Sequence, residues 1–223
     1  MHIKFIAQSG FIISLENGQS ISIDLWLNNP LMPLELVDVP KMDYVFTTHD
    51  HGDHDLTSAI EIAKRDNAWF TSSYGIAKYA SEQGVEKVER GNVGGEYSMG
   101  DLDVIQTLAF HSSDIGNPVG FIIETNEGTI YHMGDTGYFN ELKFYGELYD
   151  IDILMVPIGS RYTMDSLQAS FATADINPEI VIPMHYNTFP AIQQDPKEFE
   201  FQVKERECNA KVKIMKPGDV LEY

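Results

Sequence analysis

The segment Thr48-His49-Asp50-His51-Gly52-Asp53-His54 places three histidines and interleaved aspartates within six consecutive residues. It directly follows the apolar run Tyr44-Val45-Phe46-Thr47, which is typical of a buried strand. Imidazole and carboxylate groups are common protein ligands for zinc, manganese and iron. Because polar groups packed together in a fold must each be satisfied, so dense a cluster is destabilising without a metal ion. The segment therefore predicts a metal site at the end of a strand.

Three further candidate ligands lie far from this segment: His111, Asp135 and His185. A single histidine is more often an ordinary polar residue than a ligand, but each of these residues comes just after a strand-like apolar run. Loops at strand ends, held by a rigid sheet, are where functional sites are built. The neighbouring glycines Gly52 and Gly134 permit tight turns beside the candidate ligands. We therefore expect the three residues to complete one metal centre.

The composition predicts a globular protein with no affinity for nucleic acid or membranes. A chain of 223 residues fits one domain, residues 1–223, and its apolar fraction of 43% suffices for a sizeable core. The formal net charge of −19 repels nucleic acid phosphates, and no cluster of Lys and Arg offsets it. No apolar run approaches the roughly 20 residues of a membrane helix. The partner that remains is a small-molecule substrate; the oligomeric state stays open, and a homo-oligomer is compatible with the sequence.

Three further residues capable of chemistry are expected to have only structural or incidental roles: His2, His132 and Cys208. Cys208 is the only cysteine and lies in a charged helical stretch, so it forms no internal disulfide and has no nearby histidine to activate it. The absence of internal disulfides agrees with a reducing compartment. The start of the chain lacks the apolar core of a signal peptide. A cytoplasmic location is therefore the expectation.

Hydrophobic periodicity predicts an α+β fold in which layers of sheet are covered by helices. Asn17-Gly18 lies between two strand-like runs and is a strong hairpin signal. The segment from Leu25 to Pro40 is rich in Pro and Asn and is expected to be an active-site loop. The expected strands are 3–7, 11–15, 20–24, 43–47, 102–108, 119–124, 129–132, 153–157, 180–183 and 212–215. The expected helices follow from apolar residues at helical spacing: Leu56, Ile60 and Ala63; Ile76, Tyr79 and Ala80; residues 139–149; Leu167, Phe171 and Ala174; and residues 196–207.

The His-x-His-x-Asp-His pattern of residues 49–54 resembles the signature of the metallo-β-lactamase superfamily. The resemblance implies a four-layer αββα sandwich, in which two similar halves pack their sheets face to face between outer helices. Carried over by motif, it implies that a first metal is held by His49, His51 and His111, and a second by Asp53, His54 and His185. Asp135 would bridge the two metals. Asp24 resembles the carboxylate that orients a ligand imidazole through its other N–H.

Several strings resemble more closely a bacterial and archaeal group of metal-dependent hydrolases related to the L-ascorbate-6-phosphate lactonases. They are Gly134-Asp135-Thr136-Gly137, Val156-Pro157-Ile158-Gly159, Tyr162-Thr163-Met164 and, most specific of all, Pro183-Met184-His185-Tyr186-Asn187-Thr188-Phe189-Pro190. Three residues depart from the group: Gln8 and Arg161 each stand where His is usual, and Leu25 stands where Pro often follows Asp24. The ligand set is intact, so the departures bear on substrate preference.

The implied chemistry is hydrolysis by a metal-bridged hydroxide, with Asp53 and Asp135 as the catalytic carboxylates. Arg161, Tyr186 and Asn187 are the candidate substrate-binding residues. Because an Arg guanidinium can fork onto a phosphate or carboxylate, a small anionic ester, lactone or phosphodiester is the expected substrate. Affinity and the His-rich ligands favour zinc for the two divalent ions, with manganese, nickel or iron as alternatives.

Other functions known for this fold require residues different from those of this chain. Diiron flavoproteins of this fold replace the second cluster histidine by Glu and carry a flavodoxin domain, whereas here the position is His51. Nucleic acid processing normally adds domains or an exosite arm and conflicts with the acidic charge. The alternative that remains is a non-catalytic metal- or ligand-binding protein on the same fold.

Overall fold

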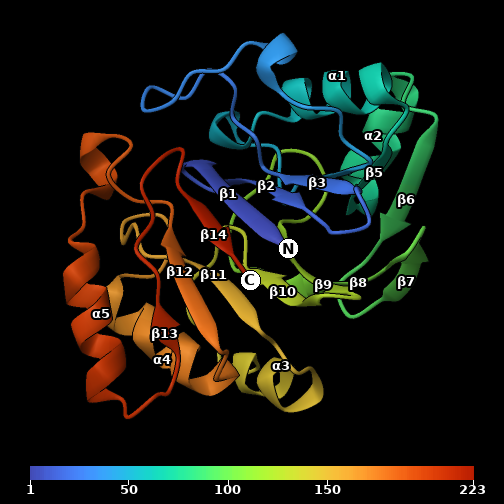
Figure 1. The fold of residues 1–223 in the computed structure, drawn as a ribbon. Helices are drawn as coiled ribbons and strands as arrows, with labels where there is room; N and C mark the ends of the chain where they lie inside the picture. Colours follow the sequence, from blue (N-terminus) through green and yellow to red (C-terminus); the bar gives the residue numbers. More distant parts are fainter.

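The computed structural model describes residues 1–223 and has four layers, with two mixed sheets packed face to face between two layers of helices (Figure 1). The first sheet has the strand order β14 (Val220–Glu222), β1 (His2–Ala7), β2 (Gly10–Ser14), β3 (Ser20–Ile23), β4 (Tyr44–Phe46), β5 (Trp69–Ser73) and β6 (Lys87–Gly91). The second has the order β13 (Lys211–Val212), β12 (Ile180–Met184), β11 (Ile153–Pro157), β10 (Gly128–His132), β9 (Val119–Thr125), β8 (Leu102–Leu108) and β7 (Glu96–Met99). The expected αββα sandwich is confirmed.

The helices cover the two outer faces. The first sheet is covered by α1 (Leu56–Asp66) and α2 (Tyr74–Glu82), and the second by α3 (Leu142–Leu148), α4 (Ser166–Ile176) and α5 (Pro196–Glu205). Short 3₁₀ turns lie at Leu36–Asp38, Gly52–His54 and Pro190–Ile192. None of the helices combines the length and the apolar character needed to cross a lipid bilayer.

The two sheets repeat one pairing pattern, which makes the halves of the chain alike. Along β14-β1-β2-β3 the pairs are antiparallel, and along β3-β4-β5-β6 they are parallel. The strands from β7 to β13 repeat this change from antiparallel to parallel pairing at β10. Since C-terminal ends of parallel strands meet at one edge, the loops after β3, β4, β10, β11 and β12 gather where the site lies.

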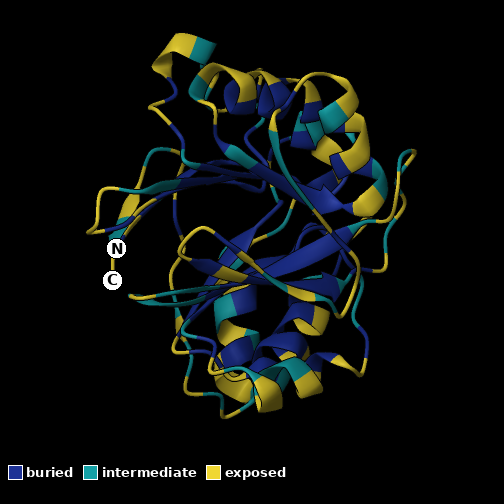
Figure 2. Cartoon of the chain, turned by 90° about the vertical axis from the view of Figure 1, so that its right-hand side faces the viewer, coloured by how far each residue is buried: buried dark blue, intermediate teal, exposed yellow.

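The core has three layers because both faces of each sheet are buried (Figure 2). Between the sheets, alternate strand residues interdigitate, and Phe46 of β4 meets Phe121 of β9 edge to face with ring centroids 5.1 Å apart. The intervening residues, such as Val45 and Ile122, pack against the outer helices. This double burial explains why the strands are short apolar runs with little alternation.

Several sequence expectations need correction. Four strands were not predicted: β5, β6, β7 and β14. The strand expected at 212–215 is only Lys211–Val212, and the helix expected at 139–149 is only Leu142–Leu148. Edge strands such as β6 and β7 carry charged, half-exposed side chains, so they lack a continuous apolar signal.

The residues used to predict α4 lie on the wrong face of that helix. Leu167 and Phe171 are exposed, whereas the buried face contains small residues such as Ala169 and Ala172. Small residues allow close helix packing: a side chain at Gly146 of α3 would meet the carbonyl oxygen of Ile176 at 2.6 Å. Large apolar residues of α4 therefore lie on its outer face, where the guanidinium of Arg206 covers the Phe171 ring at 3.4 Å from its centroid.

Candidate metal centre

The histidine-rich segment begins where β4 ends, at the edge between the two sheets. His51 caps a single 3₁₀ turn, Gly52–His54, which turns Asp53 and His54 back toward the sheet ends. Asp55 then adopts a left-handed conformation and caps α1 by accepting the backbone N–H of Ser58. The short turn between strand and helix thus presents the side chains of His49, His51, Asp53 and His54 to one region of space.

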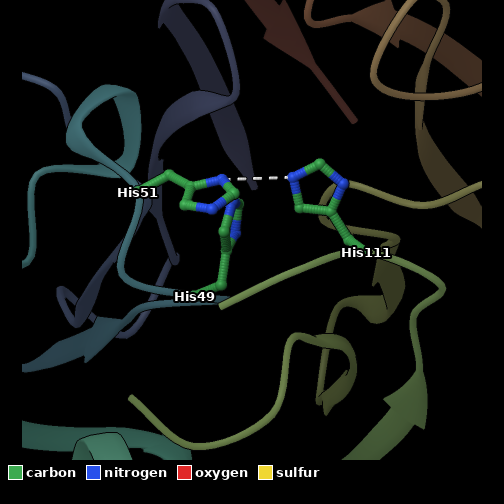
Figure 3. A group of neighbouring side chains, drawn as sticks. All are labelled: His49, His51 and His111. Carbon is green, nitrogen blue, oxygen red and sulfur yellow. Dashed lines mark hydrogen bonds between the residues drawn. The ribbon is translucent and has the colours of Figure 1, made fainter. Parts of the chain in front are cut away.

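The first group of converging side chains comprises His49, His51 and His111 (Figure 3). His51 Nδ1 lies 3.0 Å from His49 Nε2 and 3.2 Å from His111 Nε2. A tetrahedral zinc ion with Zn–N bonds of about 2.0–2.1 Å would hold its nitrogen ligands roughly 3.3 Å apart. Both distances match the spacing of ligands on one ion, and the candidate ligand atoms of all three residues lie within 4.8 Å of one another.

The second group comprises Asp53, His54, Asp135 and His185, with one candidate ligand atom from each lying within 4.8 Å of the others. His185 Nε2 lies 2.9 Å from Asp135 Oδ2 and 3.4 Å from Asp53 Oδ2. His54 Nε2 lies 3.5 Å from Asp135 Oδ1. The structure thus brings together all seven predicted ligands, in the two sets expected from the sequence.

Asp135 joins the two groups. Its Oδ2 lies 3.6 Å from His111 Nε2 of the first group and 2.9 Å from His185 Nε2 of the second. Its side chain is only 2% exposed, so the carboxylate is held between the two sets rather than in solvent. This placement is the one required of a carboxylate that bridges two ions.

The donor set fits divalent metal ions. His54 Nε2 and Asp135 Oδ1 are buried and have no hydrogen-bond partner within the protein. A buried polar atom without a partner is destabilising. Both atoms belong to the predicted ligand set, so a metal ion would satisfy them.

Two hydrogen bonds orient the ligand rings on the side of the first sheet. Asp24, which follows β3, accepts the backbone N–H of Thr48 at 2.8 Å, the Thr48 hydroxyl at 2.7 Å and His54 Nδ1 at 2.8 Å. Because Thr48 Oγ1 donates to Asp24, it accepts from His49 Nδ1 at 3.0 Å. Both rings therefore present Nε2 to the centre, and the ligand imidazole that Asp24 was expected to orient is that of His54.

Gln8 supports the second group from the turn after β1. Its Nε2 donates to Asp53 Oδ2 at 2.7 Å, and its backbone carbonyl accepts the His185 N–H at 2.7 Å. Gln8, Asp24 and His185 all have positive φ, at 57°, 47° and 56°. Strained backbone of this kind persists where surrounding structure enforces it, which is common at functional sites.

Opposing charges dominate the electrostatics of the metal-free centre. Burial disfavours the charged form of His185, but the nearby Asp135 carboxylate outweighs it and raises the pKa of His185 to about 9. Burial opposes ionisation of Asp135, yet His185 and His54 hold its pKa well below the usual range. Burial, assisted by the proximity of His54, lowers the pKa of His49 well below its usual value. His49 therefore offers a neutral imidazole to the first group, and Asp135 offers an anionic carboxylate to the second.

Comparison with known proteins assigns the family. Residues 2–185 match the model of the β-lactamase superfamily domain. The chain belongs to the metallo-β-lactamase superfamily. It is 46% identical to a UPF0173 metal-dependent hydrolase of Staphylothermus marinus, over 99% of this chain and 98% of the relative. It is 42% identical to one of Caldivirga maquilingensis, over 99% and 97% of the two chains.

A solved structure extends the likeness to three dimensions. Igni18, described as a novel metallo hydrolase from the hyperthermophilic archaeon Ignicoccus hospitalis, is 39% identical, with a TM-score of 0.91 over 100% of this chain and 98% of that one. This chain is therefore a member of the UPF0173 family of metal-dependent hydrolases. It carries two clusters of candidate metal ligands.

One structural residue of this superfamily member was missed by the sequence reasoning. Asp50, between the first two histidines of the motif, points away from them and accepts the hydroxyl of Ser113 and the backbone N–H groups of Asp114 and Ile115, at 2.7–2.9 Å. It thereby fixes the loop that follows His111. The interleaved spacing in His-Asp-His was the available signal, since alternate residues of an extended segment face opposite ways.

The two glycines proposed for tight turns differ. Gly134 has a φ of +62°, and a side chain there would lie 2.7 Å from the Val119 carbonyl oxygen, so the turn that positions Asp135 requires glycine. Gly52 has open space around it and no positive φ. A tight turn does begin at Gly52, as expected, but that turn does not require glycine.

The centre opens into a cleft of about 510 Å³. Its lining comprises the polar residues His51, Gly52, Asp53, His111, Ser112, Asp135 and His185, with Trp26, Tyr162 and Phe189 as the aromatic residues. Trp26 lies within the segment 25–40, which was expected to form an active-site loop. His2 is exposed, and His132 is buried against the Ser9 carbonyl at 2.9 Å, so neither joins the two groups.

The three residues predicted to bind substrate are absent from this lining. Arg161 is exposed, with its guanidinium 5.6 Å from the Tyr162 ring centroid. Asn187 is tied to the backbone of Gln194, and Tyr186 faces a separate apolar cavity. The structure does not bring these three side chains to the cleft, because a position after the right strand fixes the loop but not the direction of a side chain. Tyr162, the neighbour of Arg161, is the residue of that loop that lines the cleft.

Proposed function

We propose that this chain hydrolyses an ester, lactone or phosphodiester bond of a small molecule at a centre of two divalent metal ions. The observation that carries the proposal is the convergence of seven ligand side chains into two groups that share Asp135. Both groups draw residues from the two halves of the chain, so the proposal treats residues 1–223 as one domain.

Each residue then has a defined role. His49, His51 and His111 would hold one ion, and Asp53, His54 and His185 the other, with Asp135 between them. Two ions held by these residues would supply an activated water and polarise the substrate oxygen. Gln8 Nε2 donates to Asp53 Oδ2 and so orients this carboxylate, which would bind the second ion and, with Asp135, serve as a catalytic carboxylate.

The charge of the substrate is set by the centre rather than by Arg161. The lining of the cleft contains no Lys or Arg, so an anionic group of the substrate could be neutralised only by the metal ions. Zinc is favoured because imidazole supplies most of the ligands, with manganese, nickel or iron as alternatives.

We expect the protein purified without chelator to contain two divalent ions per chain after supplementation. Elemental analysis of protein loaded separately with zinc, manganese, nickel and iron measures this. Well under one equivalent with every metal would contradict the proposed centre.

Turnover tests the function itself. A panel of uncharged and anionic esters, lactones and phosphodiesters is assayed with metal-loaded protein and with chelated protein. We expect metal-dependent hydrolysis of one bond class. Full metal loading without turnover of any class would support the non-catalytic alternative and refute the proposed hydrolysis of these bonds.

A further inference from the structure

Three aromatic side chains surround the mouth of the cleft without contributing to the hydrophobic core. They are Trp26 from the loop after β3, Tyr162 from the loop after β11, and Phe189 from the loop after β12. None of them belongs to, or packs on, any of the three core clusters. The three rings therefore line the cleft without forming part of the core.

The placement of these rings distinguishes them from ordinary exposed apolar residues. Single hydrophobic residues scattered on a surface need no explanation, but three from different loops share one cavity with the ligand side chains. Tyr162 remains 48% exposed, and Trp26 and Phe189 are half-buried. Apolar surface held open beside convergent polar groups is typical of a small-molecule site.

The aromatic walls of the cleft differ chemically from its floor, where the candidate metal ligands lie. The ligand carboxylates and imidazoles form the floor, whereas Trp26, Tyr162 and Phe189 supply apolar wall surface and the lining has no cationic side chain. The walls would therefore favour an uncharged, planar group, because aromatic faces stack on flat apolar surfaces. The cleft volume of about 510 Å³ accommodates such a group together with the reacting bond.

We propose that Trp26, Tyr162 and Phe189 form a subsite for an aromatic or similarly flat apolar group attached to the scissile bond. The inference rests on the proposed function for the reacting bond, but the subsite itself is defined by the three rings. The substrate would then be an aryl-substituted ester, lactone or phosphodiester, with any anionic character confined to the reacting group at the metal ions.

Binding of phenylphosphonate and methylphosphonate to the metal-loaded protein tests the subsite independently of turnover. Both probes carry the same anionic head for the metal ions, and only the first carries a ring. We expect phenylphosphonate to bind at least about tenfold more tightly, the effect of burying an apolar group of this size. Calorimetry gives the two affinities, and fluorescence adds a local signal because Trp26 is one of only two tryptophans.

Variants connect the preference to the three rings. Phe189→Ala and Tyr162→Ala should each reduce the preference for phenylphosphonate by roughly threefold or more and leave methylphosphonate affinity unchanged. Phe201→Ala is the matched control, because Phe201 is 53% exposed on α5 and does not line the cleft. It should leave both affinities unchanged.

The outcomes separate this inference from the proposed function. Equal affinities for the two phosphonates, no binding of either, or an unchanged preference in the variants would overturn the subsite. A preference for phenylphosphonate that is lost in the variants would support the subsite, even if no member of the hydrolysis panel were turned over and the proposed function failed.

Discussion

Asp135→Ala should abolish hydrolysis and reduce the metal content of both groups. Asp135 is the residue within reach of ligand nitrogens in both sets, 3.6 Å from His111 and 2.9 Å from His185. Removing a residue that merely orients a ligand typically costs 10–100-fold in metal affinity or activity, so losing a shared ligand should cost more than about a hundredfold. Turnover and elemental analysis are measured on the same preparation, with circular dichroism as the check on folding.

Asp53→Ala and His185→Ala are the matched comparisons, because each removes a ligand of the second group alone. Both should abolish hydrolysis while retaining about one metal ion per chain and leaving the fold largely intact. Substantial activity of either variant with the second ion missing would show that the centre works with one metal. An Asp135→Ala protein that kept both ions would contradict the bridging role.

Asp24→Asn should weaken metal binding although Asp24 is not itself a proposed ligand. Asp24 acts through Thr48 and His54, which it orients. Asp24 accepts three hydrogen bonds, from the Thr48 N–H, the Thr48 hydroxyl and His54 Nδ1. An amide nitrogen in place of one carboxylate oxygen would face a donor, which costs about 1–3 kcal/mol of stability when buried. With the His54 ring released, we expect a loss of about 10–100-fold in affinity for the second ion.

The measurements are chelator competition for affinity and urea unfolding for stability. Asp43→Asn is the control, since Asp43 accepts the backbone N–H and hydroxyl of Ser20 at the opposite end of the same strands. It should lower stability without changing metal affinity. If both variants lost stability and both kept full metal affinity, the orienting role of Asp24 would be refuted.

The metal ligands could be predicted from the sequence, whereas the residues that line the cleft above them could not. The ligands lie immediately after strands, in short turns whose geometry the strand and the motif define together, so His49 to His54 and His185 could be placed from spacing and resemblance. Arg161 and Asn187 lie on the same loops, but their directions depend on contacts with the Tyr162 ring and the Gln194 backbone. Contacts of this kind within a loop leave no periodic signal in the sequence.

The strands show the same contrast between segments that the sequence could predict and segments that it could not. Central strands such as β4 and β11 are continuous apolar runs because both of their faces are buried, and they were predicted. The edge strands β6, β7 and β14 carry exposed polar residues and were missed. Tertiary pairing rather than intrinsic pattern makes these segments strands.

The shared pairing pattern of the two sheets has a consequence for how the molecule responds to its ions. Each group combines side chains from both halves: His49 and His51 with His111, and Asp53 and His54 with Asp135 and His185. Bound ions would therefore hold the two halves together across the interface between the sheets, where Phe46 contacts Phe121. Linkage is reciprocal, so if bound ions favour contact between the halves, contact between the halves favours ion binding by the same coupling free energy. Substitutions between the sheets that separate the two halves would then lower metal affinity, even where they lie far from the cleft.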